Sequence, residues 1–226
     1  ASTAASSGDL DEKYDVVSMD RLRVEVTVSK SRELHSWPGA TGFDMRDIDQ
    51  LIGNGPVSTG SFVLYLSTIF QSPGVSFHFD REEVVQGSRK LRYTYEAPLE
   101  ASHFLLRSGR ASLPVGFEGE FWIDPATLDL SGLTIHASKV PDELPLCNVA
   151  GALDYKVSQI GDGKLMLPRR SELEIAYRDG RASRNETAFT DCREYQAESE
   201  LIFDMPAEAK APETETLGRT RIALPL

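Results

Sequence analysis

The chain has 226 residues, 40% of them hydrophobic, and a formal net charge of −11 at pH 7. A length of roughly 200–250 residues is ordinary for one β-sandwich or β-barrel domain, and the apolar fraction excludes disorder over the whole chain. The acidic excess argues against nucleic acid and anionic membrane surfaces as partners, because both need clustered Lys and Arg. Runs of about 18 apolar residues are absent, so the sequence predicts no membrane-spanning helix.

The N-terminal residues 1–13 are small, polar and low in complexity, and we expect them to form a disordered tail. The chain begins with Ala1 and not with an initiator methionine. This beginning is typical of a chain from which a signal peptide has been removed. We therefore expect a periplasmic or otherwise extracytoplasmic location.

The first predicted elements are a strand and a short helix. Apolar and polar residues alternate over Leu22–Val28, which predicts a strand with one apolar face, and Trp37-Pro38-Gly39 is a turn signal. Asp44 is a candidate N-cap for a short helix that ends at Gly53.

The main helix is predicted over residues 62–70, where Phe62, Leu66, Ile69 and Phe70 share one helical face. The other sides of this helix are also apolar, because they consist of Val63, Leu64 and Tyr65. A helix that is apolar nearly all round must be buried on more than one side. It is either a plug or lid that lies in a curved sheet, or an ordinary core helix.

After this helix the pattern is almost entirely that of strands. Two hairpin turns are predicted at Gly161-Asp162-Gly163 and at Asp179-Gly180. Residues 14–204 are expected to form one domain, and residues 205–226 a linker or the start of a following segment. The predicted strands lie around residues 75–80, 90–95, 115–123, 133–138, 153–157, 164–167, 173–177 and 201–203.

These elements predict a mainly β (α+β) fold: a large curved antiparallel sheet with one main helix and one short helix in its concave face. One helix is too small to cover the apolar face, and each apolar side chain left in water forfeits roughly 1.5–3 kcal/mol. The sheet therefore curls onto itself or leaves an apolar hollow. The candidate ligand-binding residues that line such a hollow are Phe62, Leu66, Ile69, Phe70, Phe77, Phe79, Tyr93, Phe117, Phe121, Leu133 and Ile135.

Signals of catalysis are weak throughout the sequence. The four histidines lack metal-ligand spacing, and no Gly-x-Ser-x-Gly nucleophile motif is present. Gly161-Asp162-Gly163 fails the dinucleotide fingerprint because Met166 occupies the third glycine position. The arginines of the last third favour a solvated sheet edge over a site for an acidic group. We expect no enzyme activity, no cofactor and no metal site.

Cys147 and Cys192 are the two cysteines of the chain. They are too few and too far apart for a zinc site. In an exported protein they predict a disulfide; the alternative is two unrelated buried thiols.

Several short motifs have a common resemblance. They are Ser36-Trp37-Pro38-Gly39, Val57-Ser58-Thr59-Gly60-Ser61-Phe62, Gly119-Glu120-Phe121-Trp122-Ile123-Asp124-Pro125, Leu153-Asp154-Tyr155, Leu165-Met166-Leu167-Pro168, Arg184-Asn185 and Cys192-Arg193-Glu194-Tyr195. Together they resemble a family of uncharacterised bacterial cell-envelope proteins that is similar to the lipoprotein-carrier (LolA/LolB-like) superfamily. The resemblance implies an unclosed, strongly curved sheet whose cavity holds acyl chains in the carriers, and it implies no catalytic residue.

Two functional hypotheses follow. The first is a non-enzymatic extracytoplasmic domain, expected to be a monomer, that binds a lipid or another hydrophobic ligand in a half-barrel cavity. The second is a structural or interaction module of a cell-envelope protein, in which the helix and loops of the chain fill the hollow and another envelope protein is the partner.

Overall fold

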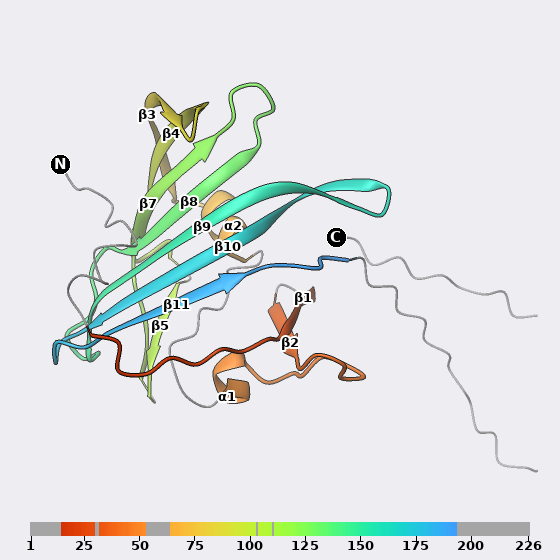
Figure 1. Cartoon of the computed structure of the whole chain (residues 1–226). Helices are drawn as coiled ribbons and strands as arrows, with labels where there is room; N and C mark the ends of the chain where they lie inside the picture. The colour runs from red at the N-terminus through yellow and green to blue at the C-terminus, as the bar shows by residue number, and fades with distance from the viewer. Residues whose placement is uncertain (1–14, 30–31, 53–63, 103, 110, 194–226) are drawn as a thin grey trace, which may run out of the picture. The chain divides into compact units, whose positions relative to one another are not determined.

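The computed structural model describes residues 15–29, 32–52, 64–102, 104–109 and 111–193 (Figure 1). These residues are mainly β and belong to one compact unit. Seven of the strands form one antiparallel sheet that does not close into a barrel. The predicted β-rich class and the large antiparallel sheet are therefore confirmed.

The sheet has the order β11-β10-β9-β8-β7-β4-β3, and neighbours in the sheet are neighbours in sequence except at β4–β7, where a small hairpin is inserted. Its strands are β3 (Ser76–Val85), β4 (Ser88–Ala97), β7 (Phe117–Ile123), β8 (Leu130–Ala137), β9 (Leu146–Ile160), β10 (Gly163–Tyr177) and β11 (Ala182–Ala188). The remaining elements are the hairpins β1 (Glu25–Ser29)–β2 (Arg32–Ser36) and β5 (Leu105–Ser108)–β6 (Ala111–Pro114), and the helices α1 (Ile48–Ile52) and α2 (Leu64–Phe70).

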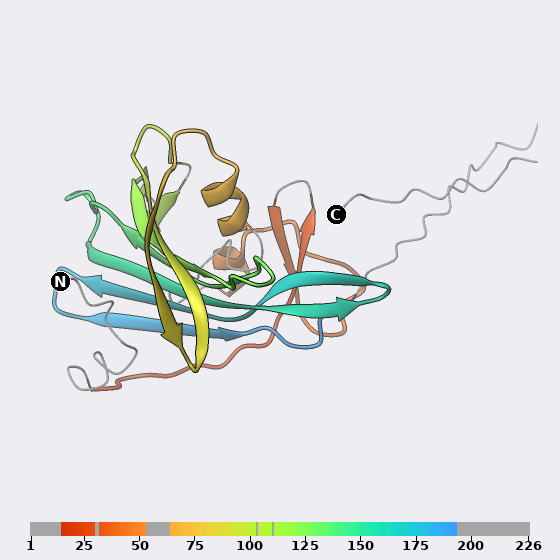
Figure 2. The same ribbon diagram turned by 90° about the horizontal axis from the view of Figure 1, so that it is seen from above.

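The two faces of the sheet differ in chemistry, because side chains alternate between faces along each strand. Figure 2 shows α2 and the β5–β6 hairpin on the same side of the sheet, which we call the helix face. Strand pairing places one register row across this face. The row runs through Phe79, Tyr93, Phe121, Leu133, Leu153, Ser171 and Thr187.

The opposite, polar face is an array of paired charges. Lys90 Nζ lies 3.1 Å from an Asp124 carboxylate oxygen, and Arg92 pairs with Glu120. Ion pairs also hold five arginines of the last third, Arg169, Arg170, Arg178, Arg181 and Arg184, so these are not a free basic cluster. Their partners are Asp154 for Arg169, Glu186 for Arg170, Asp142 for Arg178, Asp179 for Arg181, and Glu172 and Glu174 for Arg184.

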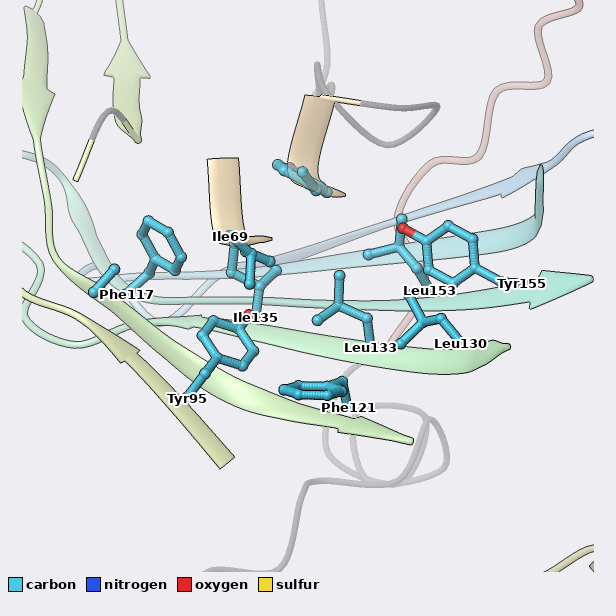
Figure 3. Close-up of a cluster of buried hydrophobic side chains, with 11 residues drawn as sticks. Ile69, Tyr95, Phe117, Phe121, Leu130, Leu133, Ile135, Leu153 and Tyr155 are labelled. Carbon is cyan, nitrogen blue, oxygen red and sulfur yellow. The ribbon is translucent and has the colours of Figure 1, made fainter. Parts of the chain in front are cut away.

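Two groups of buried side chains cover the helix face. The central cluster joins α2 to the middle of the sheet; it consists of Tyr65, Ile69, Tyr95, Ala97, Phe117, Phe121, Leu130, Leu133, Ile135, Leu153 and Tyr155 (Figure 3). The hairpin cluster lies under the β5–β6 hairpin and consists of Leu106, Val115, Leu144, Leu146, Val149 and Leu173. The hydrophobic effect drives both clusters, since their members would otherwise expose apolar surface to water.

Strand β10 joins two segments that the sequence predicts separately, residues 164–167 and 173–177. It runs through Pro168, and its pairing with β9 shifts register between Pro168 and Arg170. Proline has no N–H to donate, so a register shift is a place where a strand tolerates it. Pro168 is fully buried there.

The first helix begins later than predicted. Asp44 does not cap it, because the helix starts four residues later, at Ile48. The Asp44 carboxylate instead accepts the backbone N–H of Arg46 at 2.9 Å and pairs with the Arg46 side chain. Asp47 precedes the helix instead, and its backbone oxygen accepts the N–H of Gln50 at 3.0 Å. The predicted end at Gly53 and the predicted strand at 201–203 lie outside the described residues.

The predicted disulfide is not formed, and Cys147 and Cys192 are free thiols. Cys147 lies at the end of the sheet where Ala176 pairs with Ala182, the first residue of β11, whereas Cys192 follows the other end of β11. The 7 residues of β11 span about 20 Å at about 3.3 Å per residue. A disulfide requires Cα atoms within about 7 Å, so the sheet itself separates the two thiols.

Candidate functional site

Helix α2 occupies the middle of the helix face. Ile69 is fully buried against the central cluster, and Leu66 is half-buried beside it. The helix ends at Phe70 because residues 71–74 turn the chain toward β3, with Gly74 at a φ of +91° that side-chain-bearing residues rarely adopt. This turn brings Phe70 to the side of α2 that is nearest to β3.

An exposed group of aromatic rings lies between the end of α2 and strand β3. We call Phe70, Phe77, Phe79 and Tyr93 the aromatic patch. The residues Phe70, Phe77 and Phe79 are 42%, 41% and 56% exposed. The rings of Phe70 and Phe77 stack at 5.7 Å, and the Phe79 ring meets the Tyr93 ring edge-on at 5.4 Å. The two ring pairs are joined through the Phe121 ring, which lies 6.0 Å from Phe77 and 5.0 Å from Tyr93.

The patch continues into the buried core. The Tyr93 ring stacks on Phe121 with 5.0 Å between centroids, and Phe70 meets Phe121 edge-on at 5.1 Å. Phe121 itself is buried. A single row of rings thus leads from solvent at β3 to the centre of the sheet.

The structure brings together ten of the eleven candidate residues, all on the helix face. Seven belong to the buried core or lie partly buried against it, and three are exposed rings of the aromatic patch; Phe62 lies outside the described residues. The seven are Leu66, Ile69, Tyr93, Phe117, Phe121, Leu133 and Ile135, and the three are Phe70, Phe77 and Phe79. Tyr93 joins the two groups, because its ring contacts Phe79.

The middle of the helix face is packed. Ile69 and Phe117 are fully buried between α2 and the sheet. A pocket of about 340 Å³ lies elsewhere, between the end of β2 and α1. Its lining residues are Ser36, Trp37, Ala40, Thr41, Gly42, Phe43, Asp44 and Leu51. The accessible apolar surface among the candidate residues is thus the patch beside α2, and not a space beneath the helix.

Two buried polar groups outside the aromatic patch were missed by the sequence analysis. The Tyr155 hydroxyl and His35 Nδ1 have no hydrogen-bond partner among the described residues, although Tyr155 is only 7% and His35 only 5% exposed. Tyr155 continues the inward alternation that begins at Leu153, so its burial was predictable. His35 lies on the short strand β2, where the adjacent Ser36 is buried as well, so no alternation of apolar and polar residues signals its burial.

Burial also shifts the titration of these two groups. It raises the pKa of Tyr155, and the neighbouring Tyr65 and Glu33 raise it further. Burial lowers the pKa of His35, against smaller opposing effects of Glu33 and Asp47. Both groups are therefore held neutral near pH 7.

Tyr95 shows how a buried tyrosine in the same cluster is satisfied. Its hydroxyl donates to the backbone oxygen of Thr134 at 2.7 Å. It reaches that oxygen across Gly119, where an added Cβ would lie 2.0 Å from the oxygen of Thr134 and 2.8 Å from the Tyr95 hydroxyl. Gly119 therefore leaves room for the hydrogen bond of the Tyr95 hydroxyl. The Tyr155 hydroxyl has no such bond among the described residues.

Among the described residues, His, Cys, Asp and Glu side chains do not gather in threes with the geometry of a metal site. The helices that the structure describes are too short to cross a membrane. Comparisons of the chain with family models, curated proteins and solved structures find no match.

Proposed function

We propose that this protein is a non-enzymatic, extracytoplasmic module that binds the apolar chain of a lipid or similar ligand on the helix face of a half-barrel sheet. The main observation is the aromatic patch, in which three phenylalanines are 41–56% exposed. Fully burying a phenylalanine contributes roughly 1.5–3 kcal/mol. A bound apolar chain would supply part of that burial.

The exposed rings of the patch lie next to one another, which supports a binding surface more than a set of isolated exposed residues would. Isolated apolar residues are common on protein surfaces, whereas continuous apolar patches usually mark interaction sites. Here Phe70 stacks on Phe77, and Phe79 meets Tyr93, whose ring stacks on Phe121. The resemblance of the sequence motifs to lipoprotein carriers supports the same ligand class and the same extracytoplasmic location.

A second function is favoured by a different observation. Ile69 and Phe117 are fully buried, so α2 fills the middle of the helix face as expected of a self-filled core. A structural module with this core would use the aromatic patch to contact another cell-envelope protein.

Binding of an uncharged, environment-sensitive naphthylamine probe distinguishes the two functions. We expect micromolar binding by the full chain and about tenfold weaker binding by Phe79→Ser, since losing one buried ring corresponds to about 1.4 kcal/mol or more. Leu99→Ser, at another exposed apolar position, is the matched control. The variant Leu66→Trp enlarges a residue of α2 that packs against the central cluster. Weaker probe binding by this variant would show that the binding site extends under α2.

Native mass spectrometry with lipid extraction is the complementary measurement. Co-purifying acyl lipid supports the ligand-binding module. A protein that carries no lipid and does not bind the probe contradicts it and favours the interaction module.

A further inference from the structure

Strand β3 forms an open edge of the seven-stranded sheet (Figure 1). Among the described strands it pairs with β4 alone, so the backbone N–H and C=O groups on its outer side do not take part in the ladder. Nine of its ten residues are exposed. At the other edge of the sheet, five of the seven residues of β11 are partly buried. The β3 edge is therefore the accessible one.

The residues of β3 have a symmetric order of chemical types. Phe77 and Phe79 lie toward its start, and Val84 and Val85 form its end. All four are exposed, Val84 the most, at 68%. The charged residues Asp80–Glu83 lie between the two apolar ends. The strand thus presents apolar side chains at both ends and charges of both signs in the middle.

A bulge at Asp80 exchanges the two faces of β3 halfway along the strand. Phe79 and Arg81 pair with the consecutive residues Tyr93 and Arg92 of β4, so Asp80 is an extra residue between them. Because side chains alternate along a strand, the odd-numbered residues lie on the helix face before the bulge and the even-numbered residues after it.

A second copy of β3 is complementary to this order. We consider two β3 edges that pair antiparallel about a two-fold axis perpendicular to the sheet, which passes between Asp80 and Arg81 and keeps both helix faces on one side. From the axis outward, the opposite residues are Asp80 and Arg81, Phe79 and Glu82, His78 and Glu83, Phe77 and Val84, and Ser76 and Val85. Opposite charges meet at the axis, and apolar residues meet near the ends.

The bulge and the charges together select this register. The half of β3 before the bulge lies opposite the half after it, so each pair from Phe79 outward joins residues of the same sheet face. A shift by one residue would place Asp80 opposite Asp80 in one direction and Arg81 opposite Arg81 in the other. Like charges directly opposite are destabilising. Charges and bulges usually protect an edge from pairing, but here they favour one partner, a second copy of the same strand.

We propose that β3 is the interface of a two-fold symmetric dimer, in which the β3 edges of two copies pair antiparallel with Asp80 of each copy opposite Arg81 of the other. Main-chain hydrogen bonds between the edges and the matched side chains hold the two copies together. The two sheets then form one sheet, with both aromatic patches on the same face. This dimer takes the place of the monomer expected from the sequence, and it does not depend on lipid binding.

Sedimentation equilibrium of the full chain measures self-association. We expect the mean mass to rise from that of one chain toward that of two as the chain concentration rises to about 0.2 mM. Arg81→Asp and Asp80→Arg should each weaken dimerisation about tenfold, because the opposite-charge pairs at the axis become like-charge pairs. An equimolar mixture of the two variants should dimerise again, since opposite charges then meet once more. Lys164→Asp, the same change of charge at an exposed position of β10, should have no effect.

Cross-linking tests the register without altering these charges. In chains that also carry Cys147→Ser and Cys192→Ser, oxidation of a mixture of Phe77→Cys and Val84→Cys chains should give a disulfide-linked dimer, because opposite residues have Cβ atoms about 4.5–5.5 Å apart. Phe77→Cys mixed with Val85→Cys is the matched control, since Val85 lies on the polar face and should cross-link far less.

Three results would overturn the dimer. They are a wild-type chain that stays monomeric over the whole concentration range, association that neither charge reversal weakens, and equal cross-linking in the two cysteine mixtures. Probe binding is measured independently, so each of these results leaves the proposed function standing.

Discussion

The middle and the β3 end of the helix face share one pattern of apolar residues but differ in burial. Ile69 and Phe117 in the middle are fully buried, whereas Phe70, Phe77 and Phe79 at the end are 41–56% exposed. The 7 residues of α2 extend about 10 Å at about 1.5 Å per residue. The sheet of 7 strands is about 29 Å wide at about 4.8 Å per strand.

The place where α2 ends, at Phe70, therefore decides which apolar residues become core and which become surface. The alternation of each strand selects the face, but only the covering element removes that face from water. Beyond the end of α2, apolar side chains of the same kinds stay exposed and can contact a ligand or a partner protein. Mutations in the middle should consequently lower the stability of the protein, whereas mutations in the aromatic patch should weaken ligand binding.

The largest effect is expected in the middle. Phe117→Ala should lower the free energy of unfolding by about 3–5 kcal/mol, because it removes a fully buried ring and leaves a cavity that the sheet cannot close. Urea unfolding followed by circular dichroism measures the loss. Phe77→Ala is the control from the exposed region, and an equal loss in both variants would remove the distinction between the regions.

A second test concerns the close approach that supports Tyr95. Gly119→Ala should cost about 1–3 kcal/mol of unfolding free energy, since the new Cβ would lie 2.0 Å from the oxygen of Thr134 and force the strands apart. Gly132→Ala is matched to it, because the nearest atom there is 3.5 Å away. Similar unfolding midpoints for both variants would show that the space over Gly119 is not needed.

The buried polar region should make stability depend on pH through His35, whose pKa burial lowers below the ordinary value of 6.5. Below that value the unfolded chain binds more protons at this residue than the folded chain, so stability falls as pH falls and is regained as pH rises. The slope from one group is at most about 1.4 kcal/mol per pH unit.

Urea unfolding between about pH 5 and pH 8 measures this dependence across the range in which histidine titrates. The variant His35→Gln should flatten the profile, whereas His78→Gln, at an exposed position on β3, should not. A wild-type profile that is as flat as that of His35→Gln would contradict the burial of a neutral imidazole.

The smallest effect on stability is expected in the aromatic patch. Phe79→Ala should change the unfolding free energy by no more than about 0.5 kcal/mol, because this ring is 56% exposed. Its effect should appear in probe binding instead. If the loss of stability approaches that of Phe117→Ala, then Phe79 belongs to the core and the comparison between the two regions does not hold.

Local sequence patterns were enough to predict much of this molecule. Alternation over single strands placed Phe79, Tyr93, Phe121 and Leu133 on one face, since side chains in a strand change sides at every residue. Glycine at the turn near Gly161 and at Asp179-Gly180 marked two hairpins that the structure contains. These features depend only on neighbouring residues.

Other features depend on contacts between segments that are far apart in the chain, and only the tertiary structure decided these. Strand order separates Cys147 from Cys192 by the length of β11. The reach of α2 decides that Phe117 is core and Phe79 is surface. In each case the physical cause is a contact between segments far apart in the chain, which residue type and spacing alone do not specify.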